Sequence, residues 1–103
     1  LITELRTVAA DGLWLSGAFD RDVVGVHFTF APDLDRVNAV LPSIEEILLP
    51  LGGRPHWGKH FLATAADVAP LYPRLDDWRA LVERYDPRGV FRNRFLEERL
   101  LGD

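Results

Sequence analysis

Residues 22–30 read DVVGVHFTF, and this alternation of side chains is the feature that most constrains how the chain can fold. Successive side chains of a strand point to opposite faces of a sheet. One face of the expected strand is a continuous apolar stripe of Val24, Val26, Phe28 and Phe30. The other face is small and polar, with Val23, Gly25, His27 and Thr29. We therefore expect the first face to meet a core and the second to leave room for a ligand.

Two further segments have strand patterns. Residues 2–9 (ITELRTVA) place Glu4, Arg6 and Val8 on one face, and residues 54–62 (RPHWGKHFL) place Trp57, Lys59 and Phe61 on one face. Asp11-Gly12 marks a turn after the first strand, and residues 13–15 fit either a short strand or an apolar loop. If the three strands are neighbours, one polar sheet face gathers Glu4, Arg6, His27, Thr29 and, in a suitable register, Lys59.

Helical patterns fill the rest of the chain. An amphipathic helix is predicted within residues 33–51, with Asp33 as N-cap, an internal Pro42 that should kink or split it, and apolar residues at Leu34, Val37, Leu41, Ile44, Leu48 and Leu51. Thr64 and Asp67 resemble a capping box that opens a short helix. A last long helix is indicated by Leu75, Trp78, Leu81, Val82 and Tyr85 and stops at residues 86–89.

The order of these elements predicts an α+β fold, with helices covering one face of a mainly antiparallel sheet. The tail, residues 90–103, fits either a short extended piece or a final helical turn. The 103 residues support one domain. Since residue 1 is Leu and falls within a pattern, we expect a piece of a longer chain.

Charge and composition exclude several classes of protein. The net charge of −4 argues against a nucleic-acid binder, and no apolar run approaches the roughly 18 residues of a membrane span. The chain has no cysteine, which excludes thiolate chemistry and fits a cytoplasmic protein. Its twelve basic residues include a single lysine, Lys59, between aromatic residues.

The polar face suits a polyhydroxylated ligand, because each ligand hydroxyl can use both a donor and an acceptor. Simpler interpretations stay open: Glu4 and Arg6 as an exposed ion pair, His27 as a half-buried structural histidine, and Thr29 and Lys59 as ordinary strand and solvated residues. A metal site is not favoured, because His56 and His60 would lie about 13 Å apart along a strand.

Three motifs carry a resemblance to a known family. RPHWGK at 54–59, LYPRLDDW at 71–78 and DPRGVFRN at 86–93 resemble the C-terminal region of sugar and alditol oxidases, which are vanillyl-alcohol-oxidase-type flavoproteins and include aldonolactone oxidases. The upstream segment, ELRTVAADGLWLS and RDVVGVHFTF, is more similar to alditol (xylitol-type) oxidases. The resemblance covers essentially the whole chain.

The resemblance implies a longer, two-domain enzyme. FAD would be bound mainly by an N-terminal domain that is absent from this chain. Residues 1–62 would supply strands and a helix of the cap (substrate) domain, and residues 63–103 a helical segment that packs toward the FAD domain. The isolated fragment would then be inactive, and its partners would be a sugar alcohol such as xylitol or sorbitol, O2 and its own FAD domain.

The resemblance also implies site residues. Substrate would be bound by Glu4, Arg6, His27, Thr29 and Lys59, and the cofactor by Arg6, His56, Lys59 and Asn93. The catalytic residues would be Arg6, Lys59 and His27, with Lys59 and His27 as alternative proton acceptors. The reaction implied is oxidation of a terminal alcohol to an aldehyde, with electrons passing through FAD to O2 to give H2O2; an aldonolactone oxidase and a non-enzymatic ligand-binding module are the alternatives.

Overall fold

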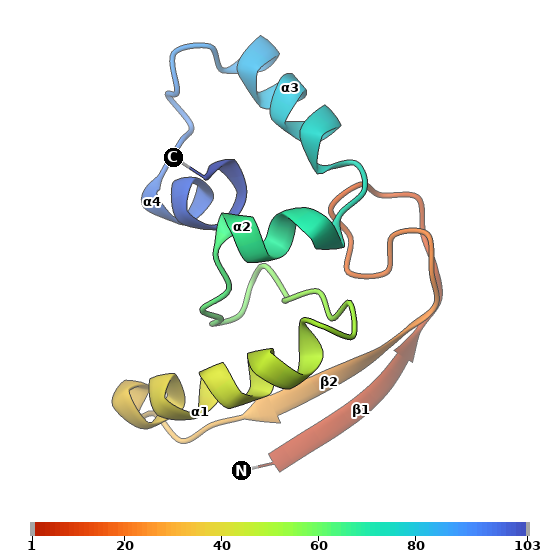
Figure 1. Cartoon of the computed structure of the whole chain (residues 1–103), viewed down its shortest axis with the longest axis vertical. Helices are drawn as coiled ribbons and strands as arrows, with labels where there is room; N and C mark the ends of the chain where they lie inside the picture. Colours follow the sequence, from red (N-terminus) through yellow and green to blue (C-terminus); the bar gives the residue numbers. More distant parts are fainter. Residues whose placement is uncertain (1, 103) are drawn as a thin grey trace.

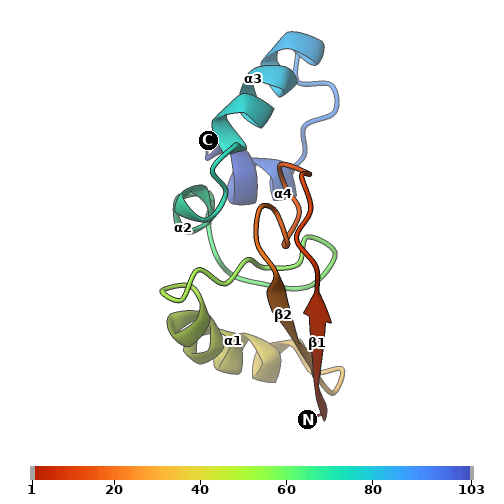
Figure 2. The same cartoon turned by 90° about the vertical axis from the view of Figure 1, so that its right-hand side faces the viewer.

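The computed structural model describes residues 2–102 and confirms the α+β class. An antiparallel ribbon of β1 (Ile2–Val8) and β2 (Val23–Thr29) precedes helix α1 (Leu34–Leu48). The rest is helical: α2 (Ala65–Val68), η1 (Ala69–Leu71), α3 (Leu75–Tyr85), α4 (Arg94–Leu96) and the π-helical turn η2 (Glu97–Leu101). The ribbon and α1 lie at one end of the molecule and α3 at the other, with α2 and α4 between them (Figures 1 and 2).

The ribbon has the strands that the sequence predicts, but the expectation that the apolar face of β2 meets a core is wrong, because none of its residues is buried. Helix α1 lies along β2 in both views (Figures 1 and 2). Even so, Val24 and Val26 remain 60% and 39% exposed, and every residue of β1 is exposed. A two-stranded ribbon alone is marginally stable in water, so this one depends on the rest of the molecule.

Helix α1 begins where the sequence predicts. The side chain of Asp33 accepts a hydrogen bond from the backbone N–H of Arg36 at 3.1 Å. The helix then runs as one element through Pro42 to Leu48, so of the two expected effects of Pro42, a kink or a split, the split does not occur. The proline removes one backbone donor, and the helix bonds on either side of it persist.

The third predicted strand, residues 54–62, is wrong: the segment is an irregular loop with a turn at residues 57–58. Pro55 has no N–H to give to a neighbouring strand. The backbone N–H groups of Leu62 and Ala63 donate instead to the carboxylate of Glu45 on α1, at 2.7 and 3.2 Å. Side chains therefore satisfy backbone groups that a sheet would otherwise have to pair.

The later helices agree with their sequence signals. Thr64 and Asp67 form the predicted capping box at the start of α2, and α3 ends at Tyr85. The tail takes the helical alternative, in α4 and η2. Residues 13–15 take the loop alternative, within a connection closed by a single bridge between Asp11 and Phe19.

The core lies between the loop at 54–63 and the C-terminal helices. Its buried members are Phe61, Ala63, Val68, Tyr72, Leu75 and Leu100. Leu15 and Trp57 pack against this cluster, so the connection between β1 and β2 is seated on it. None of the helices within residues 2–102 is long and apolar enough to cross a membrane.

We predict that Thr64→Ala lowers the free energy of unfolding by about 1 kcal/mol at neutral pH, because the α2 cap is lost. The hydrogen bonds from the Thr64 backbone N–H and hydroxyl, both 2.8 Å, hold the pKa of Asp67 below its ordinary 3.8. A depressed carboxylate pKa stabilises the fold above the unfolded-state value and ceases to do so as pH falls through the folded-state value. The stability gap between the variant and the parent should therefore narrow in acid, where the bond from the Thr64 hydroxyl to the ionised carboxylate no longer contributes; a constant gap would contradict the role of the carboxylate.

Candidate functional site

The ribbon brings together four of the five predicted substrate-binding residues. Glu4 lies directly opposite His27, Arg6 opposite Gly25, and Ile2 opposite Thr29. Directly opposed residues of an antiparallel pair share a face. Glu4, Arg6, His27 and Thr29 therefore occupy one face, which we call the polar ribbon face.

Two contacts order the side chains on the polar ribbon face. Arg6 donates to the carboxylate of Glu4 at 2.7 Å, and His27 Nε2 lies 3.2 Å from the hydroxyl of Thr29. The side chains of Arg6 and Glu4 are 74% and 48% exposed, so this ion pair contributes little to stability. Exposure leaves both charged groups open to a ligand that can replace their contacts with water.

Lys59 and His56 lie on a tight turn and not on a sheet. The turn is closed by the backbone N–H of Lys59, which donates to the carbonyl of His56 at 3.0 Å. Both residues are exposed. The Gly58 N–H donates to His56 Nδ1 at 3.0 Å, so the neutral imidazole carries its proton on Nε2. The expectation that a strand register places Lys59 on the polar ribbon face is therefore wrong.

Sequence reasoning missed the role of Arg54 and Trp57 as anchoring residues. Arg54 donates to the carbonyls of Leu71 and Phe19, each at 2.8 Å, and its guanidinium lies 5.1 Å from the ring centre of Tyr72. Burial lowers the pKa of Arg54, and the nearby charge of Arg21 lowers it further. Trp57 Nε1 donates to the carbonyl of Leu15 at 2.7 Å. The first and fourth residues of the RPHWGK motif thus hold the turn.

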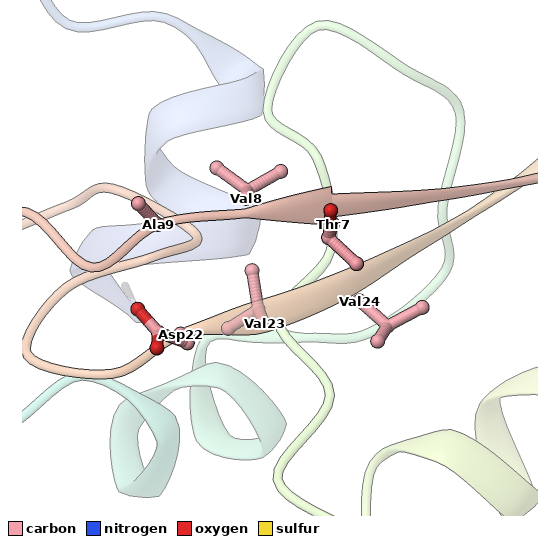
Figure 3. Close-up of a pocket in the computed structure, with 6 residues that line it drawn as sticks. All are labelled: Thr7, Val8, Ala9, Asp22, Val23 and Val24. Carbon is pink, nitrogen blue, oxygen red and sulfur yellow. The ribbon is translucent and has the colours of Figure 1, made fainter.

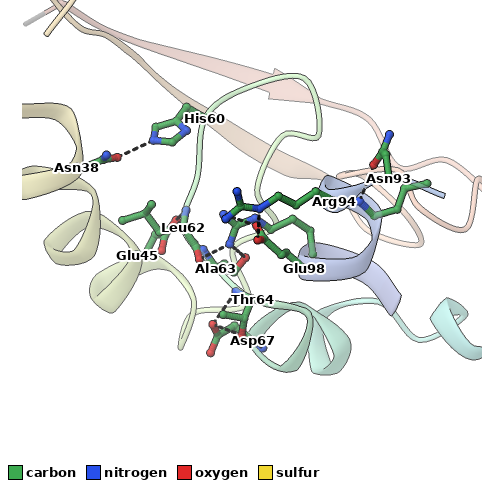
Figure 4. Close-up of polar contacts among 12 residues, drawn as sticks. Asn38, Glu45, His60, Leu62, Ala63, Thr64, Asp67, Asn93, Arg94 and Glu98 are labelled. Carbon is green, nitrogen blue, oxygen red and sulfur yellow. Dashed lines mark hydrogen bonds and ion pairs between the residues drawn. The ribbon is translucent and has the colours of Figure 1, made fainter. Parts of the chain in front are cut away.

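The segment that follows the turn is held from two sides. Figure 4 shows Glu45 of α1 beside Leu62 and Ala63, whose N–H groups it accepts. From η2, Arg99 donates to the carbonyls of the same two residues, at 2.6 and 3.0 Å. No spacing rule links residues 45, 62 and 99, so sequence reasoning missed this clamp.

Asn93, predicted to contact the cofactor, is the N-cap of α4. Its side-chain oxygen accepts from the Leu96 N–H at 2.9 Å, as Figure 4 shows in part. The preceding DPRG turn is fixed by Asp86, which is 9% exposed and accepts from the N–H groups of Val90 and Phe91 at 2.7 and 2.9 Å. Both side chains thus stabilise the local structure. The amide nitrogen of Asn93 can still contact a ligand, because only its side-chain oxygen is used in the cap.

An open hollow of 430 Å³ lies at the loop end of the ribbon, and it contains none of the predicted site residues. Thr7, Val8, Ala9, Asp22, Val23 and Val24 line it (Figure 3). Within residues 2–102, no three His, Cys, Asp or Glu side chains are grouped to hold a metal ion. The polar ribbon face and the His56–Lys59 turn therefore remain the groups suited to a polar ligand.

Comparisons with known proteins show the family to which the chain is similar. The profile of the D-arabinono-1,4-lactone oxidase family matches residues 3–99. An alditol oxidase of a Streptomyces species is 46% identical over 96% of this chain and 24% of its own length. An L-gulono-1,4-lactone dehydrogenase of Mycobacterium tuberculosis is 37% identical over 96% of this chain and 23% of its own, and a Bos taurus L-gulonolactone oxidase is 33% identical over 92% and 22%.

The chain thus spans about a quarter of the length of these relatives. All three of them are named as oxidoreductases of sugar alcohols or sugar lactones. The family profile extends over nearly all of the chain and includes every predicted site residue. On this similarity, the chain belongs to the D-arabinono-1,4-lactone oxidase family.

Proposed function

We propose that this chain is the substrate-binding C-terminal part of an FAD-dependent alditol oxidase, which converts the terminal alcohol of a polyol to an aldehyde and reduces O2 to H2O2. The observation that carries the proposal is the register, which sets Glu4 opposite His27 with Arg6 and Thr29 on the same face. Adjacent hydroxyls of a polyol present donors and acceptors at intervals that such a face can satisfy. The 46% identity to an alditol oxidase supports the choice of substrate class.

Each polar group has a chemical role in the proposal. Arg6 and Lys59 would bind the reacting hydroxyl and stabilise developing negative charge, since both are exposed cations. Glu4 would accept a hydrogen bond from the neighbouring hydroxyl, and His27 and Thr29 would bind hydroxyls further along the substrate. Lys59 and His27 are the two candidates to take the hydroxyl proton.

The chemistry of the residues present would also suit a flavin. Arg6, Lys59 and the Nε2–H of His56 offer donors to electron-rich ring atoms, and the Asn93 amide would add another. FAD would supply the acceptor for the hydride and the route of electrons to O2. In this proposal, residues 1–62 belong to a cap domain and residues 63–103 return toward a separate FAD domain.

The test is substrate profiling of the full-length protein. With xylitol or sorbitol under anaerobic conditions, the visible absorption of bound flavin should bleach, and admission of O2 should restore it with release of H2O2. An aldonolactone is the comparison substrate, because it presents secondary hydroxyls on a cyclic ester in place of an open-chain polyol. Bleaching by neither class would overturn the proposal.

An aldonolactone oxidase or dehydrogenase is the second candidate. The family profile is named after an oxidase that acts on a lactone, and two of the relatives above also have lactones in their names. Faster reduction by the lactone than by either polyol would favour it. A full-length protein that binds no flavin would favour a ligand-binding module without enzymatic activity.

A further inference from the structure

The two parts of the candidate site are joined by side chains and not by a shared sheet. The polar ribbon face lies on β1 and β2, which are connected by residues 9–22. Trp57 and Arg54, on either side of His56, donate to carbonyls within that connection: Trp57 to Leu15 at 2.7 Å and Arg54 to Phe19 at 2.8 Å. These bonds link the His56–Lys59 turn to the ribbon.

Both tethers are themselves fixed by the core. The Trp57 ring lies 5.1 Å from the Tyr72 ring and 6.0 Å from the Phe61 ring, between centroids. Arg54 makes its second strong bond to the Leu71 carbonyl, at 2.8 Å. Burial also raises the pKa of Tyr72 to about 12, so the ring under Arg54 stays neutral at working pH. A turn held in this way has little freedom to tilt.

We infer that Arg54 and Trp57 are positioning residues, which set the His56–Lys59 turn at a fixed place relative to the polar ribbon face; this inference rests on the proposed function. Lys59 has a long, flexible side chain on an exposed turn. A flexible ammonium can act at a defined atom only if its backbone is held, since a small displacement of a reacting group costs much of its effect. The tethers provide that restraint without touching the substrate.

The first test measures the mobility of the His56–Lys59 turn directly and does not depend on enzyme activity. In the full-length holoenzyme, Trp57→Phe keeps an aromatic ring but removes the Nε1–H donor to Leu15. Amide hydrogen exchange in peptides covering residues 54–62 should become about 3- to 10-fold faster. Trp78→Phe is the matched control, because Trp78 packs against the same core from α3 and lies outside the turn. Equal exchange of the 54–62 peptides in both variants would overturn the inference.

The second test asks whether Trp57 acts through Lys59. Trp57→Phe should slow anaerobic flavin reduction at saturating polyol by about 3- to 10-fold, with little change in KM. In a Lys59→Met background the same substitution should have no further effect, because the group that it positions is gone. A loss that multiplies in the double variant would show general destabilisation and overturn the positioning role.

The substitution Arg54→Lys applies both tests to the second tether, because it keeps the positive charge and removes the planar guanidinium. Lysine cannot reach both carbonyls with a planar fork, so exchange and reduction should change as for Trp57→Phe. Arg79→Lys is the matched control, because Arg79 also donates twice to a backbone carbonyl, that of Leu100, at 2.9 and 2.7 Å. Should the parent enzyme oxidise neither polyols nor lactones, the proposed function fails, while the exchange data still decide whether the tethers hold the turn.

Discussion

Replacing Lys59 by Met in the full-length enzyme should slow anaerobic flavin reduction by xylitol or sorbitol by about 10²–10³-fold, the usual effect of removing a donor that stabilises transition-state charge. Methionine keeps the length and apolar stem of the side chain and removes only the ammonium. Lys59 is exposed on its turn, so the fold should be unaffected. Stopped-flow absorption of the flavin measures the rate, and thermal unfolding checks the fold.

Two variants sharpen this experiment. Lys59→Arg should recover only part of the rate, because a planar guanidinium cannot replace a compact ammonium at one atom. Arg36→Met removes another exposed cation, with a side chain 87% accessible, from the start of α1 and should leave the rate unchanged. Near-normal reduction by Lys59→Met would rule out the proposed role of Lys59 and leave His27 as the candidate base.

The largest expected loss of stability follows from Arg99→Met, about 2–4 kcal/mol. The substitution leaves the carbonyls of Leu62 and Ala63 without their charged donor, and hydrogen bonds to charged groups contribute more than neutral ones. It also removes a guanidinium 5.5 Å from the ring centre of the buried Phe61. Differential scanning fluorimetry of the full-length protein should show a lower melting temperature.

Arg94→Met is the control for this stability prediction. Arg94 also projects from the C-terminal helical segment, but its side chain is 89% exposed and is paired with Glu98 on the surface. Screening by water makes such a pair weak, so the melting temperature should hardly change. A similar fall in both variants would mean that the clamp on residues 62 and 63 contributes no more than surface charge.

Local sequence signals predicted most of the elements. Caps at Asp33 and Thr64 and the stop after Tyr85 are set by a few neighbouring residues, and the structure confirms them. The third strand failed because Trp57 and Phe61 contact the core from a loop, while Lys59 between them is exposed. Alternation indicates burial on one side, and it does not by itself require a strand partner.

The polar ribbon face could be predicted because strand parity and register depend on short-range rules. The place of Lys59 could not, because it depends on tethers that cross 35 to 42 residues of chain from Arg54 and Trp57. The clamp from Glu45 and Arg99 is likewise long-range and carries no motif. Side chains that form hydrogen bonds with distant backbone groups produce no periodic pattern in the sequence.

Within residues 2–102, each strand of the ribbon has one hydrogen-bonded neighbour, so the outer backbone edge of each strand can pair with another strand. Strands add to a sheet sideways, within its plane, whereas side chains stand above and below that plane. A sheet built outward from this ribbon can therefore widen or change its borders while the charges of Glu4 and Arg6 stay where they are.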